Sequence, residues 1–223
     1  MKLIDARFVT SAVDARGIPA DGIPHVALVG RSNVGKSTLI NALAGSRLAR
    51  TSAAPGKTRL ANLYRLEIDG GAGGPGRWRV CLVDLPGYGY ARGGQASVEE
   101  LARVAQSYFD VAQPFKAASQ PVARSSAGLK ARATYNVGGV LHLVDARHPG
   151  LDADIEAAAW LATLGIERAV IATKVDKLSR AERTKNLGEL QRQLGMAPLP
   201  VSARGGEGLE DLWRLIAKLS RRP

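Results

Sequence analysis

The most specific chemical pattern in this chain is a short glycine-containing segment near its N-terminus. Residues 30–37 read Gly-Arg-Ser-Asn-Val-Gly-Lys-Ser, which matches the phosphate-binding loop pattern G-x-x-x-x-G-K-[ST]. Glycines let such a backbone curl so that successive N–H groups converge on phosphate oxygens, while a lysine reaches the outer phosphates and a hydroxyl ligates Mg²⁺. The pattern predicts a nucleoside polyphosphate site formed by Gly30, Arg31, Ser32, Asn33, Val34, Gly35, Lys36, Ser37 and Thr38.

The segments on either side of this loop are those that such a loop requires. An apolar run over 25–29 predicts a strand, and residues 36–44 predict a helix that ends near Gly45. The N-terminus of that helix would add a partial positive charge and unpaired N–H groups to the phosphate site. This strand, loop and helix order favours a functional loop over a chance match in a glycine-rich chain.

A second motif, which begins with an aspartate, follows the strand expected at 77–83. It reads Asp84-Leu85-Pro86-Gly87, and the C-terminal end of a strand is where ligands bind in parallel sheets. Asp84 could hold Mg²⁺ through its water shell, and the Gly87 N–H could contact a γ-phosphate and lose that contact when the phosphate leaves. A D-x-x-G segment alone also fits a simple turn. Its place about fifty residues after the first loop favours the nucleotide reading.

Two later segments bear on the choice of base. In Thr173-Lys174-Val175-Asp176 the carboxylate could accept hydrogen bonds from the N1–H and the exocyclic amine of guanine, which adenine does not offer in that arrangement. Lys174 would lay its stem along the base. The alternative is that Asp176 simply caps the next helix. The segment Val201-Ser202-Ala203 could donate a backbone N–H to guanine O6, although this tripeptide carries little information by itself.

The loop after the first helix could supply a further magnesium ligand. We expect Thr58 to do so because it directly precedes the next strand, although Thr51 and Ser52 also carry hydroxyls. Its neighbours Gly56 and Lys57 are expected beside the nucleotide. The expected metal ligands are Ser37, Thr58 and Asp84, and the residues expected to act in hydrolysis are Lys36, Thr58 and Gly87.

The remaining segments predict an α/β fold with a mostly parallel six-stranded sheet and helices on both faces, because near-continuous apolar strands alternate with helices. Residues 1–24 form an N-terminal lead with a possible strand at 6–9, and residues 25–223 form a single domain. Residues 113–135 carry four basic side chains and no acid, and are expected to form an extended basic loop. Further strands are expected at 60–68, 77–83, 140–144, 169–172 and 198–201, and further helices at 97–112, 152–164, 179–194 and 207–219.

Composition indicates the kind of partner and compartment. The 223 residues carry 31 Lys and Arg against 20 Asp and Glu, a net charge of +11, which an RNA or anionic membrane partner would use, although compositional drift is an alternative. A single cysteine, Cys81, fits a reducing cytosol and a packing role. The sequence shows no stretch of about 20 apolar residues and no signal-peptide core, so we expect a cytoplasmic location and no stable membrane insertion.

With these motifs taken together, the chain resembles the EngB/YsxC/YihA family of bacterial ribosome-assembly GTPases over about residues 8–220. The segments that carry the resemblance are 30–41, 51–58, 84–91, 145–149 and 173–177. The resemblance implies a P-loop NTPase of the Ras-like G-domain type that hydrolyses GTP with Mg²⁺. It also implies association with the large ribosomal subunit during assembly, and a link to cell division and septation. The segments 113–135 and 70–76 look longer than the family pattern, and Thr173 replaces the usual asparagine.

The resemblance also bears on the rate of hydrolysis. Ras-like enzymes place a glutamine after D-x-x-G to orient water, whereas this chain has Tyr88, so we expect slow intrinsic turnover that a partner or a monovalent cation accelerates. Asn33 is the residue type that holds K⁺ in related GTPases, but it could equally shape the loop. Equal rates of GTP hydrolysis in K⁺ and in Na⁺ would exclude activation by K⁺.

Three classes of function remain open from the sequence. A switch that binds GTP and GDP and docks on rRNA or a large-subunit precursor, as a monomer, is the leading one. A metabolic enzyme is less favoured, because His25, His142 and His148 are scattered and look structural or exposed. A membrane-associated or other small G protein is the alternative that the basic and apolar last helix suggests, although such a helix is usually half core and half solvent face.

Overall fold

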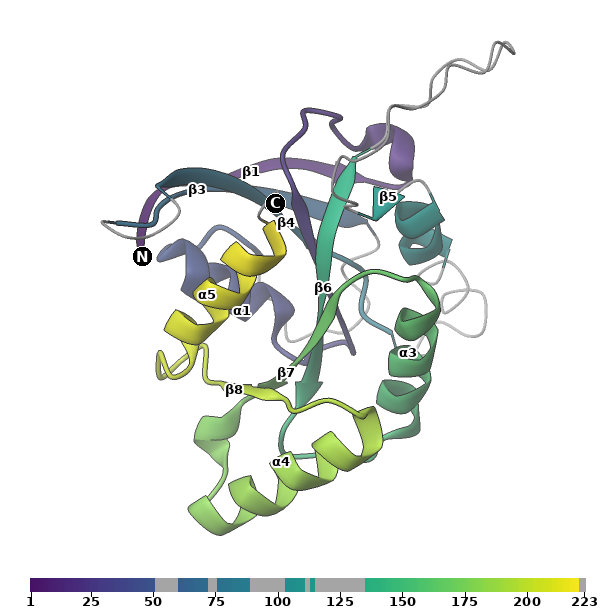
Figure 1. The fold of residues 1–223 in the computed structure, drawn as a ribbon, viewed down its shortest axis with the longest axis vertical. Coiled ribbons are helices and arrows are strands. Elements are labelled where there is room, and N and C mark those ends of the chain that lie inside the picture. Colours follow the sequence, from purple (N-terminus) through teal and green to yellow (C-terminus); the bar gives the residue numbers. More distant parts are fainter. Residues whose placement is uncertain (51–59, 72–75, 89–102, 111–112, 115–134, 221–223) are drawn as a thin grey trace.

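The structure is a computed structural model that describes residues 1–50, 60–71, 76–88, 103–110, 113–114 and 135–220. Its centre is one twisted sheet with the strand order β1-β3-β4-β2-β6-β7-β8, and β5 pairs with β6 (Figure 1). The strands are β1 (Lys2–Ala12), β2 (His25–Gly30), β3 (Ala61–Asp69), β4 (Arg77–Asp84), β5 (Gln113–Pro114), β6 (Asn136–Asp145), β7 (Arg168–Thr173) and β8 (Leu199–Val201). The helices are α1 (Lys36–Ala44), α3 (Asp152–Thr163), α4 (Arg180–Leu194) and α5 (Leu209–Ser220), and residues 103–110 are also helical.

The expected α/β fold is confirmed, but the sheet is wider than the predicted six strands. Strands β4, β2, β6, β7 and β8 run parallel, whereas β1, β3 and β4 pair antiparallel. The possible strand at 6–9 extends over the whole of β1, which pairs with β3 from Lys2–Asp69 to Ala12–Ala61. Register shifts within β1 break its two-residue periodicity, which explains why the sequence pattern showed only its middle. The lead segment is therefore the edge of the sheet.

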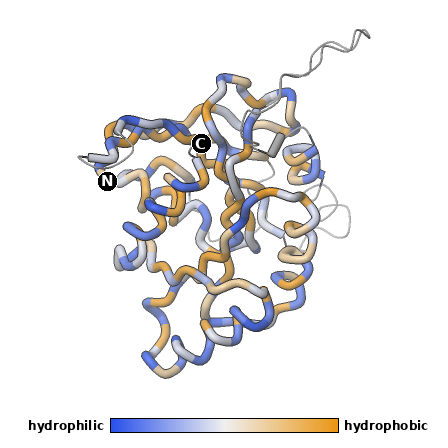
Figure 2. Tube along the Cα trace, in the orientation of Figure 1, coloured by the Kyte–Doolittle hydropathy of each residue, from blue (hydrophilic) through white to orange (hydrophobic). Residues whose placement is uncertain are grey.

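Two apolar layers hold the helices on the two faces of the sheet. On one face α1 and α5 pack on the central strands through residues such as Leu39, Ile40 and Ile216. On the other face the helical residues 103–110 and α3 pack through residues such as Tyr108 and Leu161. Figure 2 shows the hydrophobic residues concentrated along the central strands. Every residue of β2 is buried, as expected for a strand covered on both sides.

The last helix is a core helix. Leu212, Ile216 and Leu219 of α5 are buried, while Arg214 pairs on the outside with Glu210 and Asp211. Its apolar side is thus already occupied by the sheet, which confirms the half-core interpretation of its pattern. No helix in the described part of the chain is long and apolar enough to cross a bilayer.

Two segments of the sequence analysis are only partly described. The hairpin between β3 and β4 is present, with Gly70 N–H donating to the carbonyl of Gly76 at 2.8 Å, but its tip at 72–75 lies outside the described residues. Most of the basic segment 113–135 also lies outside them. What is described at its ends is the two-residue pairing of β5 with β6 and the buried ring of Tyr135.

Where β6 packs against the end of α5, position 138 has no room for a side chain. A Cβ at Gly138 would lie 2.0 Å from the carbonyl oxygen of Leu219, so the end of α5 would have to move. We predict that Gly138→Ala lowers the free energy of unfolding by about 1–3 kcal/mol through overpacking. Gly188→Ala, at an α4 position with open space, should instead raise it by about 0.5–1 kcal/mol. Urea denaturation measures the free energy of unfolding of both variants. The same change in both would contradict the packing argument.

A buried histidine makes stability depend on pH. His25 is 1% exposed, and burial lowers its pKa from 6.5 to about 4. Below pH 6.5 His25 therefore becomes protonated in the unfolded chain but stays neutral in the folded protein. This difference lowers the free energy of unfolding by about 2 kcal/mol at pH 5. His25→Gln removes that term, so the stability deficit of the variant relative to wild type should shrink by about 2 kcal/mol between pH 7.5 and pH 5. A deficit that does not change with pH would show that His25 is not held neutral.

Candidate functional site

The phosphate loop curls between the end of β2 and the start of α1. Asn33 and Gly35 adopt left-handed backbone conformations, with φ of 63° and 116°. Gly30 has no room for a side chain, because a Cβ there would lie 2.7 Å from the carbonyl oxygen of Leu143. The Lys36 ammonium donates to the carbonyl of Gly30 at 2.9 Å. Burial lowers the pKa of Lys36, and the nearby Asp84 carboxylate opposes that shift. The Lys36 ammonium therefore lies against the backbone of the phosphate loop.

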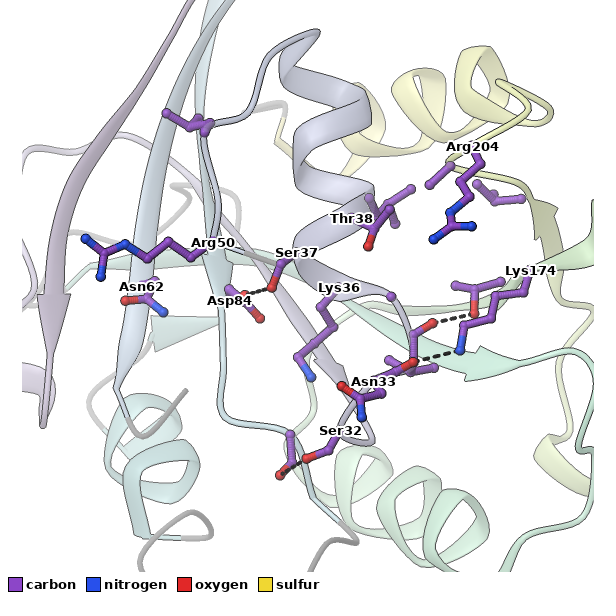
Figure 3. A pocket seen from close by; sticks show the side chains of 18 of the residues that line it. Ser32, Asn33, Lys36, Ser37, Thr38, Arg50, Asn62, Asp84, Lys174 and Arg204 are labelled. Atoms are coloured by element: carbon purple, nitrogen blue, oxygen red, sulfur yellow. Dashed lines mark hydrogen bonds between the residues drawn. The ribbon is translucent and has the colours of Figure 1, made fainter. Parts of the chain in front are cut away.

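Two of the expected metal ligands meet beside Lys36. The Ser37 hydroxyl, at the start of α1, donates to Asp84 Oδ2 at 2.9 Å, and Asp84 stands at the end of β4 (Figure 3). The other carboxylate oxygen, Oδ1, is buried and has no hydrogen-bond partner among the described residues. Burial raises the pKa of Asp84, while Lys36 and Ser37 lower it. An unpartnered buried carboxylate oxygen next to a hydroxyl is chemistry that suits a hard divalent cation such as Mg²⁺.

The D-x-x-G segment lies directly against the phosphate loop. The Ser32 N–H donates to the Tyr88 carbonyl at 3.1 Å, and the Ser32 hydroxyl donates to the Gly87 carbonyl at 3.4 Å. A Cβ at Gly87 would lie 2.7 Å from Ser32 N and 3.0 Å from Lys36 Nζ. Only glycine allows the two loops to approach this closely, so the Gly87 backbone lies next to the lysine expected to bind phosphate.

The segment expected to bind the base is also attached to the phosphate loop. The Thr173 hydroxyl lies 2.8 Å from the Val34 carbonyl, which it can donate to. Lys174 has a φ of 61°, and its ammonium donates to the Asn33 carbonyl at 2.7 Å and to Asp145 Oδ2 at 2.8 Å. The sequence analysis gave Asp145 no role of its own. It anchors the stem of Lys174, and although burial opposes it, hydrogen bonds from Arg147 and Lys174 hold its pKa below the usual range.

Asp176 projects from a short 3₁₀ turn, η2 (Val175–Lys177). The Ser202 hydroxyl donates to its Oδ1 at 2.8 Å, and this hydrogen bond is the main reason why its pKa is lowered. The N-cap of α4 is Ser179, which forms a capping box with Glu182, so the helix-cap interpretation of Asp176 is wrong. Ser202 therefore orients the carboxylate through its side chain, a role that the sequence analysis did not foresee.

Most of the expected nucleotide contacts line one open pocket of about 1290 Å³. Among the expected residues the pocket walls include Ser32, Asn33, Val34, Gly35, Lys36, Ser37, Thr38, Asp84, Gly87, Thr173, Lys174, Asp176, Val201 and Ala203. Leu85, Pro86 and Val175 are buried and do not line the pocket. Gly56, Lys57 and Thr58 lie outside the described residues, so the structure does not place the third expected metal ligand.

The side chain of Arg31 binds a residue that was not among the expected site residues. Its Nε donates to both carboxylate oxygens of Asp154, each at 3.1 Å, instead of pointing into the pocket. Asp154 lies in the first turn of α3 and is 2% exposed. An acid in a first helical turn usually signals only a favourable interaction with the helix dipole. No signal in the sequence distinguishes a surface acid from this buried one.

Comparisons with known proteins agree with this geometry. A family model described as a 50S ribosome-binding GTPase matches residues 25–174. The chain is 39% identical to a probable GTP-binding protein EngB of Pelotomaculum thermopropionicum, over 98% of this chain and 96% of the relative. It is 40% identical to a protein of the same name from Heliobacterium modesticaldum, over 97% of this chain and 92% of that one.

Solved structures share the fold. Era in complex with MgGDPNP and nucleotides 1506–1542 of 16S ribosomal RNA aligns with a TM-score of 0.67 at 21% identity, over 91% of this chain and 58% of that one. A crystal structure of a probable GTP-binding protein engB aligns with a TM-score of 0.59 at 22% identity, over 89% of this chain and all of the other. The motifs, the fold and the full-length relatives lead to one conclusion: the chain belongs to the EngB family of GTP-binding proteins and is a GTPase.

Proposed function

We propose that this GTPase is a guanine-nucleotide switch that acts in the assembly of the large ribosomal subunit. The observation that carries the switch is the contact of Gly87 and Tyr88 with the phosphate loop, because it puts the D-x-x-G segment where a γ-phosphate would lie. The matching family's description and the net charge of +11 support a ribosomal partner rich in phosphate. A link to cell division and septation, and a cytoplasmic location, are part of the same proposal.

In this proposal the phosphate loop and α1 bind the triphosphate. Backbone N–H groups of the loop other than those of Ser32 and Val34, together with the Lys36 ammonium, bind the β- and γ-phosphates, and Lys36 exchanges its carbonyl partners for phosphate oxygens. Ser37, Asp84 and Thr58 would hold Mg²⁺, which would supply charge neutralisation in hydrolysis. Gly87 contributes a backbone N–H to the γ-phosphate.

The base is bound at the other end of the pocket. Asp176, held by Ser202, accepts from guanine N1–H and the exocyclic amine, while the Lys174 stem covers one face of the ring. The Ser202 N–H already donates to the Glu207 carbonyl at 3.0 Å, so the backbone donor to guanine O6 is expected from Ala203 within the segment Val201–Ala203.

Replacing one carboxylate tests the base assignment. Asp176→Asn exchanges an acceptor for a donor, so the exocyclic amine of guanine loses its partner and GDP affinity should fall about 10- to 100-fold. Xanthine carries a carbonyl at that position, so XDP should bind the variant better than GDP. Calorimetric titration measures both. Asp211→Asn, which removes the same charge from the exposed side of α5, should leave GDP binding unchanged. Unaltered preference for guanine in Asp176→Asn would contradict the assignment.

Hydrolysis without a partner should be slow. Tyr88 follows Gly87 and its hydroxyl is engaged with Asp154, so it cannot orient water as a glutamine amide would. A ribosomal partner or K⁺ near Asn33 would supply the missing activation. The Asn33 carbonyl already accepts from Lys174, and this ties the loop position to the base segment.

Binding to ribosomal particles separates the proposal from a membrane-associated switch. The full-length protein with a non-hydrolysable GTP analogue should co-sediment with large-subunit precursors, more than with small subunits, and binding should weaken as salt is raised. Lys36→Ala, which removes the phosphate-binding ammonium, should lose the nucleotide dependence. Binding to anionic vesicles but not to ribosomal particles would contradict the ribosomal role and favour the membrane alternative.

A further inference from the structure

A buried polar network lies behind the nucleotide pocket, on the side facing α3. At its centre is the Asp154 carboxylate, which accepts from Arg31 Nε at 3.1 Å and from the Tyr88 hydroxyl at 2.9 Å. The same hydroxyl lies 2.7 Å from His142 Nε2. The network thus connects the phosphate loop, the D-x-x-G segment, β6 and α3. These four side chains are not needed to explain nucleotide binding.

The direction of each hydrogen bond follows from the charges. Asp154 lies against the Arg31 guanidinium and acts as an acceptor, so the Tyr88 hydroxyl donates to it. The tyrosine oxygen then accepts from His142, which places the proton of a neutral imidazole on Nε2. His142 is 1% exposed, and burial lowers its pKa to about 4. Within the described part of the chain its Nδ1 is buried without a partner, which an unprotonated nitrogen tolerates better than a charged ring would.

Tyr88 is held to the phosphate loop at both of its ends. Its backbone carbonyl accepts from the Ser32 N–H at 3.1 Å, and its hydroxyl shares Asp154 with Arg31. Gly87 is the preceding residue, so its position is fixed by these two attachments. Moving Gly87 away from Lys36 would pull the Tyr88 hydroxyl out of a low-dielectric site. Asp154 and His142 would then each lose a hydrogen bond, which is costly for buried polar groups.

We propose that Tyr88 and Asp154 are positioning residues that hold Gly87 against the phosphate loop and so favour binding of GTP over GDP. The inference rests on the proposed contact between the Gly87 N–H and the γ-phosphate. GDP has no γ-phosphate, so it gains nothing from a correctly placed Gly87, whereas GTP does. The tyrosine at the position after D-x-x-G therefore serves to set the nucleotide-dependent contact instead of orienting water.

The test compares two nucleotides in variants that keep the core filled. Tyr88→Phe retains the ring but removes the hydroxyl, and Asp154→Asn retains the shape but removes the charge. Each should weaken binding of a non-hydrolysable GTP analogue in Mg²⁺ about tenfold, while the Kd for GDP stays within about twofold, and kcat should fall. Because both changes break the same network, the double variant should lose little more than either single one.

A matched control removes a buried hydroxyl elsewhere in the same apolar layer. The Tyr135 hydroxyl donates to the Tyr108 carbonyl, away from the phosphate loop, so Tyr135→Phe should lower thermal stability without changing the ratio of GTP-analogue to GDP affinity. An unchanged affinity ratio in Tyr88→Phe and Asp154→Asn, or an equal loss of affinity for both nucleotides, would contradict the positioning role of Tyr88 and Asp154. If the γ-phosphate adds nothing to the affinity of the wild-type protein, the proposed contact of Gly87 fails instead.

Discussion

The site depends on the attachment of the phosphate loop to two other segments, the one that follows β4 and the one at the end of β7. Its N–H at Ser32 is bound by the Tyr88 carbonyl, while its carbonyls at Asn33 and Val34 are bound by Lys174 and Thr173. These loops lie at the carboxyl ends of the parallel strands β2, β4 and β7, so they meet at one edge of the sheet. A loop held in this way keeps its remaining N–H groups directed at one point, which is what phosphate binding requires.

The pocket contains two buried charged groups that a nucleotide and its metal ion would pair with. The Lys36 ammonium and the Asp84 carboxylate are both buried, and each has its pKa shifted by burial toward the neutral form. In the parts of the chain that the structure describes, one oxygen of Asp84 has no hydrogen-bond partner. A triphosphate and a divalent cation would offer opposite charges to both groups, so binding would relieve a desolvation cost that the folded chain carries by itself.

The sequence predicted the parts of the site that follow from local patterns, and missed those that depend on contacts between distant segments. The glycine loop, α1 and the pairing of Ser37 with Asp84 follow from motif spacing and strand ends. Asp154 could not be recognised, because its burial depends on Arg31 and Tyr88, which are far away in sequence. The full length of β1 was hidden by register shifts, and the Ser202 hydroxyl was overlooked because its partner Asp176 is 26 residues away.

The central claim is that one pocket recognises guanine at Asp176 and phosphates at Lys36 simultaneously. Calorimetric titration of the wild-type protein with GDP and with ADP, in the presence of Mg²⁺, tests it most directly. The account predicts GDP binding at least about 100-fold tighter than ADP binding, because adenine leaves the carboxylate unpaired in a desolvated site. Equal affinities for the two nucleotides would contradict it.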